Sequence, residues 1–251
     1  MKRHLVIALG LIVGLGLATA ASAQSTSRCA DCHFANPGSV SSAHLSEWDL
    51  SAHGRNNVGC ETCHGGDPRS FEPFVAHKDM MARTNPASPV YRANLPRTCG
   101  TCHTGPLVAF QRSKHYELLR AGDKDVPTCA TCHGEAAGVR LSPKALESQC
   151  AQCHGAGKIA PHTDFPATGR LAVEGLREAR ALLKDARAAI ARVKDPARKA
   201  ALEADAQQAE VPIIEATQAG HAFVYDQLQE RLSTARTRLS ALFDKIANPS
   251  R

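Results

Sequence analysis

The sequence predicts a mainly α-helical protein with little regular sheet, in which a loop-rich N-terminal segment precedes a long C-terminal antiparallel helical hairpin. The motif Cys-x-x-Cys-His occurs five times, and consecutive motifs begin only 31, 39, 30 and 21 residues apart. So little chain between motifs favours short helical turns joined by loops such as Gly65-Gly66-Asp67-Pro68. After Pro166 the composition changes, and apolar residues recur at helical spacing.

Each motif predicts a covalent haem attachment site. Two thiols three positions apart can reach the two vinyl groups of one haem as thioethers, and the adjoining histidine then lies beneath the iron as proximal ligand. Disulfides and structural zinc do not explain the histidine, and a thioredoxin-like pair would occur once. The sequence therefore predicts five covalently attached haem c groups, held by Cys29, Cys32, Cys60, Cys63, Cys99, Cys102, Cys129, Cys132, Cys150 and Cys153, with His33, His64, His103, His133 and His154 as proximal ligands.

The first 23 residues predict an export signal. Lys2 and Arg3 precede an apolar run that ends in Ala21-Ser22-Ala23, which is the order of charged, hydrophobic and small-residue regions in a signal peptide. A retained membrane anchor is the alternative, because the run approaches the length that spans a bilayer. We expect a signal peptide over residues 1–23, a pentahaem domain over 24–166 and a helical hairpin over 167–251, with a periplasmic or otherwise exported location and no membrane span after cleavage.

Composition and charge limit the classes of function. Aromatic residues are only 4% of the chain, so haem macrocycles are expected to serve as the core, and the N-terminal half should not fold without them. The formal charge of +6 could suggest a nucleic-acid partner. However, removal of Lys2 and Arg3 leaves 28 basic against 24 acidic residues, and each oxidised haem adds roughly one negative charge through its propionates. The loaded protein is then about neutral, so no nucleic-acid partner is expected.

The hairpin is predicted from two apolar stripes. A helix over about 169–193 carries Leu176, Leu183 and Ile190 every seven residues, with Ala179, Ala186 and Val193 three further on. Asp195-Pro196 reads as a cap and first turn, and Pro212 should interrupt or kink the helix that follows. The last helix is expected over about 213–247, with one seam through Tyr225, Leu232, Leu239 and Ile246 and another through Ile214, His221, Leu228, Ala235 and Leu242. A homodimer through these helices is the alternative use of the seams.

Five irons need five further axial ligands if all are six-coordinate, and histidine is a common haem ligand. Outside the signal and the motifs, the chain has six histidines: His44, His53, His77, His115, His162 and His221. His77 lies in the longest gap without a signature. His44 is either a ligand or an exposed helix residue, and His162 could fold back to the last haem. His221 lies on an apolar stripe, where a histidine is often a hydrogen-bonded packing residue.

These motifs resemble the multihaem c-type cytochromes, within the lineage of the nitrifier tetrahaem cytochrome, hydroxylamine oxidoreductase and pentahaem nitrite reductase. The resemblance implies that His53 in Ser51-Ala52-His53 and His115 in Ser113-Lys114-His115 are distal ligands. It also implies that His221 ligates a haem, because Gly220-His221 is similar to a piece of the family's C-terminal helices, although alanine follows where the family has asparagine.

Two functions follow from this resemblance. The first is an electron carrier of anaerobic respiration, which passes electrons between periplasmic or membrane quinol-linked redox partners through mostly bis-histidine haems. The second is a small oxidoreductase that acts on a nitrogen or sulfur oxyanion at one open haem. We favour the carrier and expect no catalytic residues, because pentahaem nitrite reductase typically has lysine in its catalytic motif, whereas all five motifs here end in histidine.

Overall fold

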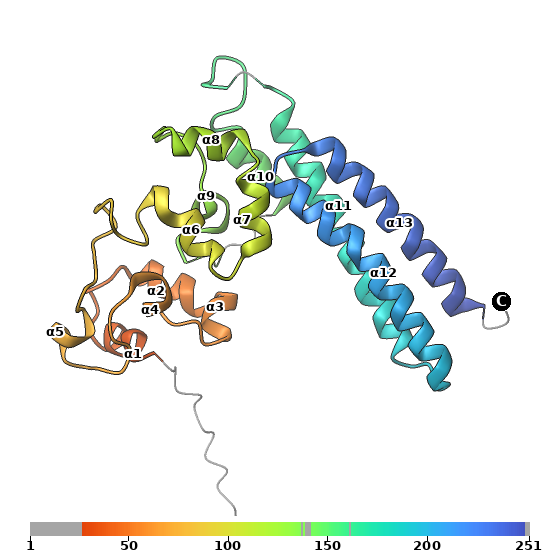
Figure 1. Ribbon diagram of the computed structural model, residues 1–251, viewed down its shortest axis with the longest axis horizontal. Coiled ribbons are helices and arrows are strands. Elements are labelled where there is room, and N and C mark those ends of the chain that lie inside the picture. Colours follow the sequence, from red (N-terminus) through yellow and green to blue (C-terminus); the bar gives the residue numbers. More distant parts are fainter. Residues whose placement is uncertain (1–26, 137, 139–141, 161, 249–251) are drawn as a thin grey trace, which may run out of the picture.

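The computed structural model describes residues 27–136, 138, 142–160 and 162–248. As predicted, the chain is mainly helical, and the described residues contain no strand beyond an isolated bridge between His154 and Ala160. The N-terminal part consists of short helices joined by loops (Figure 1). They are α1 (Arg28–Ala35), α2 (Ser42–Asp49), α3 (Ala52–Arg55), α4 (Glu61–His64), α5 (Pro73–Ala76), the 3-10 turn Arg92–Asn94, α6 (Leu95–Gly100), α7 (Thr104–Phe110), α8 (Lys114–Arg120), α9 (Cys129–His133) and α10 (Pro143–Cys150).

Three long helices form the C-terminal part, where the sequence analysis expected a hairpin of two. α11 (Phe165–Ile190), α12 (Pro196–His221) and α13 (Tyr225–Ala247) run up and down beside one another, with α12 antiparallel to the other two (Figure 1). The end of the bundle near α7 and α10 joins it to the preceding short helices, α1 to α10, which carry the five motifs and are called the haem-motif segment below. None of the described helices combines the length and the apolar character needed to cross a membrane.

Pro212 was predicted to interrupt or kink the helix, and the interruption is wrong. α12 continues through Pro212 to His221, so the last helix begins at Tyr225 and not near residue 213. Proline removes the backbone N–H that would bond to the carbonyl four residues earlier, here Gln208. The guanidinium of Arg238 on α13 donates to that carbonyl, and this bond from a neighbouring helix replaces the missing one.

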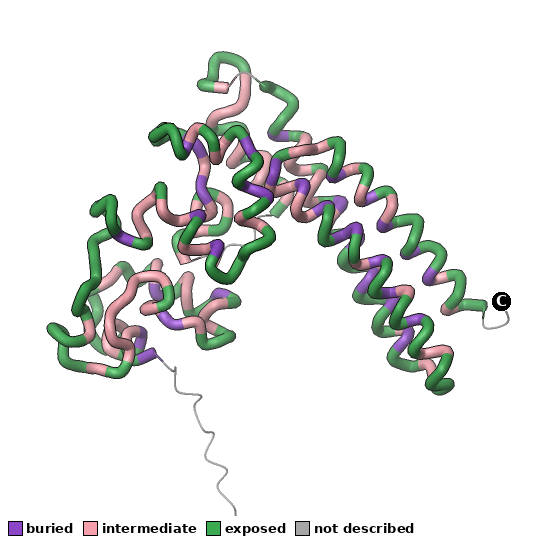
Figure 2. Tube along the Cα trace, viewed as in Figure 1, coloured by how far each residue is buried: buried purple, intermediate pink, exposed green. Residues whose placement is uncertain are grey.

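The bundle contains the main hydrophobic core. The predicted stripe on α11 is buried at Ala179, Leu183, Ala186 and Ile190, and it packs against buried residues of α12 and α13. In the seam assigned to the last helix, Leu228, Ala235 and Leu242 are buried, whereas Ile214 lies on α12 instead and is 53% exposed. The haem-motif segment has few buried positions (Figure 2), and its small cluster consists of Phe110, Leu119 and Val126. The side chains of this segment therefore supply little core of their own.

Candidate haem-binding sites

The five Cys-x-x-Cys-His motifs lie on or directly beside short helical turns. The first motif lies in α1, the second overlaps α4, and the fourth forms α9. The third and the fifth begin in the last residues of α6 and α10. A helical turn places residues three and four positions apart on one face. Both thiols and the histidine of a motif can therefore contact the same haem. No disulfide joins any of the ten cysteines, all of which lie among the described residues, so both sulfurs of every motif are available for thioether attachment.

The histidine of each motif lies opposite a second histidine from another segment. Two imidazoles that bind one iron from opposite sides, with metal–nitrogen bonds of about 2 Å, have ring centres about 6 Å apart. The five ring-centre distances are 5.9 Å for His33 and His77, 6.0 Å for His44 and His64, 5.9 Å for His53 and His103, 6.3 Å for His133 and His221, and 6.0 Å for His115 and His154. The spacing of all five pairs fits a bis-histidine haem.

The two Ser-x-His segments have one shared local structure. Ser51 and Ser113 are the N-caps of α3 and α8, so His53 and His115 both stand at the second helical position. Each serine hydroxyl accepts from a backbone N–H three residues later, at 3.1 Å in both cases, and donates to the carbonyl three residues earlier, Trp48 or Phe110. Both serines are buried. The cap therefore sets the direction in which each helix, and its histidine, begins.

His44 reaches its partner ring from a different local structure. It lies in the first turn of α2, whose N-cap is Ser41, and no side-chain bond caps that helix. Its Nδ1 is buried without a hydrogen-bond partner, and the nearest carboxylate oxygen, on Glu135, lies 3.8 Å away. The Ser-x-His sequence at Ser42 and His44 therefore does not form the serine-capped helix start seen at Ser51 and Ser113.

Three of the second histidines are oriented by backbone carbonyls. His77 Nδ1 lies 2.9 Å from the Pro73 carbonyl, His221 Nδ1 lies 2.8 Å from the Thr217 carbonyl, and His53 Nδ1 lies 3.3 Å from the Ala136 carbonyl. A ring that donates through Nδ1 has its lone pair on Nε2. This is the tautomer in which metal-binding histidines are commonly held by an outer partner.

The paired rings favour the neutral state that metal binding requires. Burial lowers the pKa of His64, and the neighbouring His44 lowers it further. Burial likewise lowers the pKa of His115 and of His133, with added contributions from the partner rings His154 and His221. A neutral imidazole can bind a metal without first releasing a proton.

His162 and His115 both lie near His154, the histidine of the fifth motif. The ring centre of His162 lies 6.4 Å from that of His154, and the His162 ring stacks on Phe165 with ring centres 4.6 Å apart. His115 lies closer, at 6.0 Å, and its segment is held by the buried Ser113 cap, whereas His162 is exposed. The geometry therefore matches five of the six candidate histidines to five different proximal rings and leaves His162 beside the fifth.

Consecutive motifs are neighbours in space. Burial raises the pKa of the Cys60 thiol to about 11, and Cys29 of the first motif contributes to this shift. Cys63 is influenced in the same way by Cys99 and Cys102 of the third motif, and Cys132 by Cys150 of the fifth. The thiols of Cys99 and Cys129 interact directly, which raises the pKa of Cys99. As thioethers these sulfurs would not titrate, but their proximity places the five motifs in a series that follows their order along the chain.

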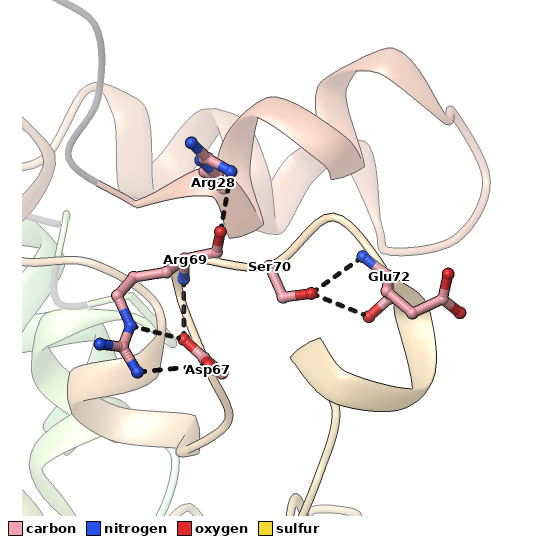
Figure 3. A network of polar contacts seen from close by, with 5 residues as sticks. All are labelled: Arg28, Asp67, Arg69, Ser70 and Glu72. Atoms are coloured by element: carbon pink, nitrogen blue, oxygen red, sulfur yellow. Dashed lines mark hydrogen bonds and ion pairs between the residues drawn. The ribbon is translucent and has the colours of Figure 1, made fainter.

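A polar network ties the first motif to the loop after the second (Figure 3). The backbone N–H of Arg28 donates to the Pro68 carbonyl, and its guanidinium donates to the Arg69 carbonyl at 2.8 Å. Arg69 in turn bonds to Asp67 and lowers the pKa of that carboxyl group. Because Arg28 directly precedes Cys29, these bonds fix the first attachment site against the second.

Five Cys-x-x-Cys-His motifs, together with five histidine pairs at the spacing of a shared iron, are the arrangement expected of a multihaem c-type cytochrome. The family model described as "Cytochrome c554 and c-prime" matches residues 14–65, which include the first two motifs. No curated protein and no solved structure matches the chain. The family match covers 52 of the 251 residues and supports covalently bound haem c at the two motifs within it.

Proposed function

We propose that this protein is an exported pentahaem c-type cytochrome that relays electrons between partner proteins of an anaerobic respiratory chain through bis-histidine haems. One observation carries the proposal. Each of the five proximal histidines has a second imidazole at a ring-centre distance of 5.9 to 6.3 Å. A haem iron with two strong protein ligands has no open position for a substrate, which suits electron transfer.

The histidine pairs assign the proposed axial ligands. From the first motif to the fifth, the distal ligands would be His77, His44, His53, His221 and His115. Haem c bound at these positions accepts and donates single electrons. The chain's own residues tether each group through two cysteines, hold both axial nitrogens, and set ring orientation through carbonyls and serine caps.

The order of the motifs supports a relay. The thiols of Cys99 and Cys129 interact directly, and electrostatic interactions between Cys29 and Cys60, Cys63 and Cys99, and Cys132 and Cys150 indicate that the other consecutive motifs also lie near one another. Electrons could therefore pass from the first haem to the fifth, or in the reverse direction, without leaving the protein. The first and fifth sites would face the redox partners.

The alternative function, reduction or oxidation of a nitrogen or sulfur oxyanion, requires one haem with an open position. Every proximal ring has an imidazole opposite it, and the fifth has two within 6.4 Å. The histidine geometry therefore favours the carrier over the enzyme.

We also propose that the protein is exported and exchanges electrons with partners outside the cytoplasm. The predicted signal, residues 1–23, lies outside the described residues. Periplasmic or membrane quinol-linked proteins would supply or accept the electrons, and a homodimer through the C-terminal helices is a further proposal.

Two measurements on the purified holoprotein test the proposed function. The intact mass should exceed that of the polypeptide from Gln24 by five haems, and any other number contradicts the attachment sites. Low-temperature electron paramagnetic resonance of the oxidised protein should show only low-spin haem. A stoichiometric high-spin signal, with carbon monoxide binding after reduction, would instead favour the enzyme.

A further inference from the structure

The turn between α12 and α13 contains a bulky residue in a left-handed backbone conformation. Phe223 has φ +58°. The other non-glycine residues with positive φ among the described parts of the chain are Asn57 and Asp79, whose short polar side chains tolerate this region. A phenylalanine in this conformation is unusual, because glycine would adopt it with less strain. Its presence indicates that contacts of the phenylalanine side chain compensate for the backbone strain.

The backbone around Phe223 forms a Schellman helix end. The N–H of Phe223 donates to the Gly220 carbonyl at 3.1 Å, and the N–H of Val224 donates to the Ala219 carbonyl at 3.0 Å. Glycine is the common residue at the left-handed position of this motif. Here glycine stands three residues earlier, inside the helix, and phenylalanine takes the strained position.

The ring of Phe223 lies against a proposed haem ligand. Its centre is 4.4 Å from that of His115, and the two rings stand nearly perpendicular at 79°. It also lies near Phe110, at 6.4 Å, and Phe110 packs edge-on against Tyr116. The edge-to-face arrangement is a favourable one for aromatic rings, so Phe223 restricts the orientation of the His115 ring.

Phe223 therefore joins two haem sites. It closes the helix that ends at His221, the proposed distal ligand of the fourth haem, and its ring packs on His115, the proposed distal ligand of the fifth. We propose that Phe223 is a positioning residue that holds His115 in the orientation needed to bind the fifth iron. This inference rests on the proposed axial ligands.

Three substitutions at Phe223 separate this role from a structural one. Phe223→Gly removes the ring but relieves the left-handed strain, so the thermal stability should be unchanged or higher. Nevertheless, the low-spin signal should fall by up to one haem equivalent, and carbon monoxide should bind to the same fraction of the reduced protein. Phe223→Asn, which also tolerates the left-handed region, should behave in the same way. Phe223→Tyr keeps the ring and should restore the parent spectrum.

The variant His115→Ala distinguishes failure of the inference from failure of the proposed ligands. If His115→Ala alters one haem while Phe223→Gly and Phe223→Asn leave the spectrum and all potentials unchanged, the positioning role is refuted and the ligand assignment stands. If His115→Ala itself changes no haem, the assignment of His115 fails, and the role of Phe223 fails with it.

Discussion

The guanidinium of Arg238 donates a hydrogen bond to the carbonyl of Gln208, which is the acceptor that Pro212 leaves without its helical partner. Proline in a helix interior costs about 3 kcal/mol of helix stability relative to alanine. A substitute donor to the Gln208 carbonyl should recover part of this loss. The relationship also fixes α13 against α12 at the middle of the bundle.

Arg238→Met should therefore lower the free energy of unfolding by about 1 kcal/mol, the usual net worth of one hydrogen bond. The loss should be smaller in a Pro212→Ala background, because the alanine N–H can bond to Gln208 within the helix. Denaturant unfolding of the four holoproteins in a double-mutant cycle measures this coupling. Equal losses in both backgrounds would show that Arg238 acts independently of Pro212.

The serine caps at Ser51 and Ser113 should matter to the haems as well as to the helices. Ser51→Ala or Ser113→Ala removes an N-cap and should cost about 1 kcal/mol of stability. Because each cap sets the start of a helix whose second residue is a proposed ligand, one haem potential should also shift in each variant. Redox titration of the holoproteins measures the shift.

Ser142→Ala provides the matched control. Ser142 caps α10 through the same bond, from the backbone N–H three residues later, at 3.1 Å, but lysine stands two residues after it where the others have histidine. Because Ser142 is exposed, whereas Ser51 and Ser113 are buried, its stability loss should be no larger than theirs, with all five potentials retained. An equal potential shift in the Ser142 variant would mean that capping affects the haems only through global stability.

The bundle stripe was predictable because it is a local pattern, and the five attachment sites are predicted from an equally local one. A motif of five residues specifies its own chemistry, and a buried stripe such as Leu183, Ala186 and Ile190 follows from helical periodicity alone. The pairing of histidines was not predictable in this way. His44 lies opposite His64, and His53 opposite His103, through tertiary arrangements that leave no mark on spacing.

The errors in the sequence analysis have a common physical origin. Pro212 was expected to interrupt or kink the helix, but α12 continues through it, and the donor that compensates for it comes from Arg238 on a neighbouring helix. The expected hairpin of two long helices depended on a helix boundary near Pro212. The true boundary, after His221, gave no clear signal in the sequence, because phenylalanine stands at the position where glycine usually marks a helix end. Local propensity was overruled in both places by contacts from elsewhere in the chain.

Gly175 should be required for the close approach of α11 and α13. A Cβ at this position would lie 2.7 Å from Cδ1 of Leu232, which is fully buried. Gly175→Ala should therefore destabilise the protein by about 1 to 3 kcal/mol, as overpacking commonly does. Gly169→Ala, in the same helix, meets only ordinary contacts from 3.4 Å outward and should be neutral or stabilising. Thermal unfolding of both holoproteins decides the point, and similar melting temperatures for the two would contradict the close-contact argument.

His221 links the bundle to the haems, and His162 provides its control. His221 Nδ1 lies 2.8 Å from the Thr217 carbonyl, and its ring is nearly parallel to that of His133, at 13°. If His221 is the distal ligand of the fourth haem, His221→Met should replace a nitrogen ligand by a thioether sulfur and raise the potential of that one haem. His162→Gln should leave all five potentials in place, because His115 already lies opposite His154.

Redox titration and low-temperature electron paramagnetic resonance of the two holoproteins separate the assignments. A shift of one potential in the His221 variant alone supports the bundle as part of the haem site, in which α12 supplies an axial bond. An unaltered titration for His221→Met would remove His221 from the ligand set and leave it as a packing residue held by Thr217. A shift in the His162 variant would instead move the fifth axial bond from His115 to His162, since both rings lie within 6.4 Å of His154.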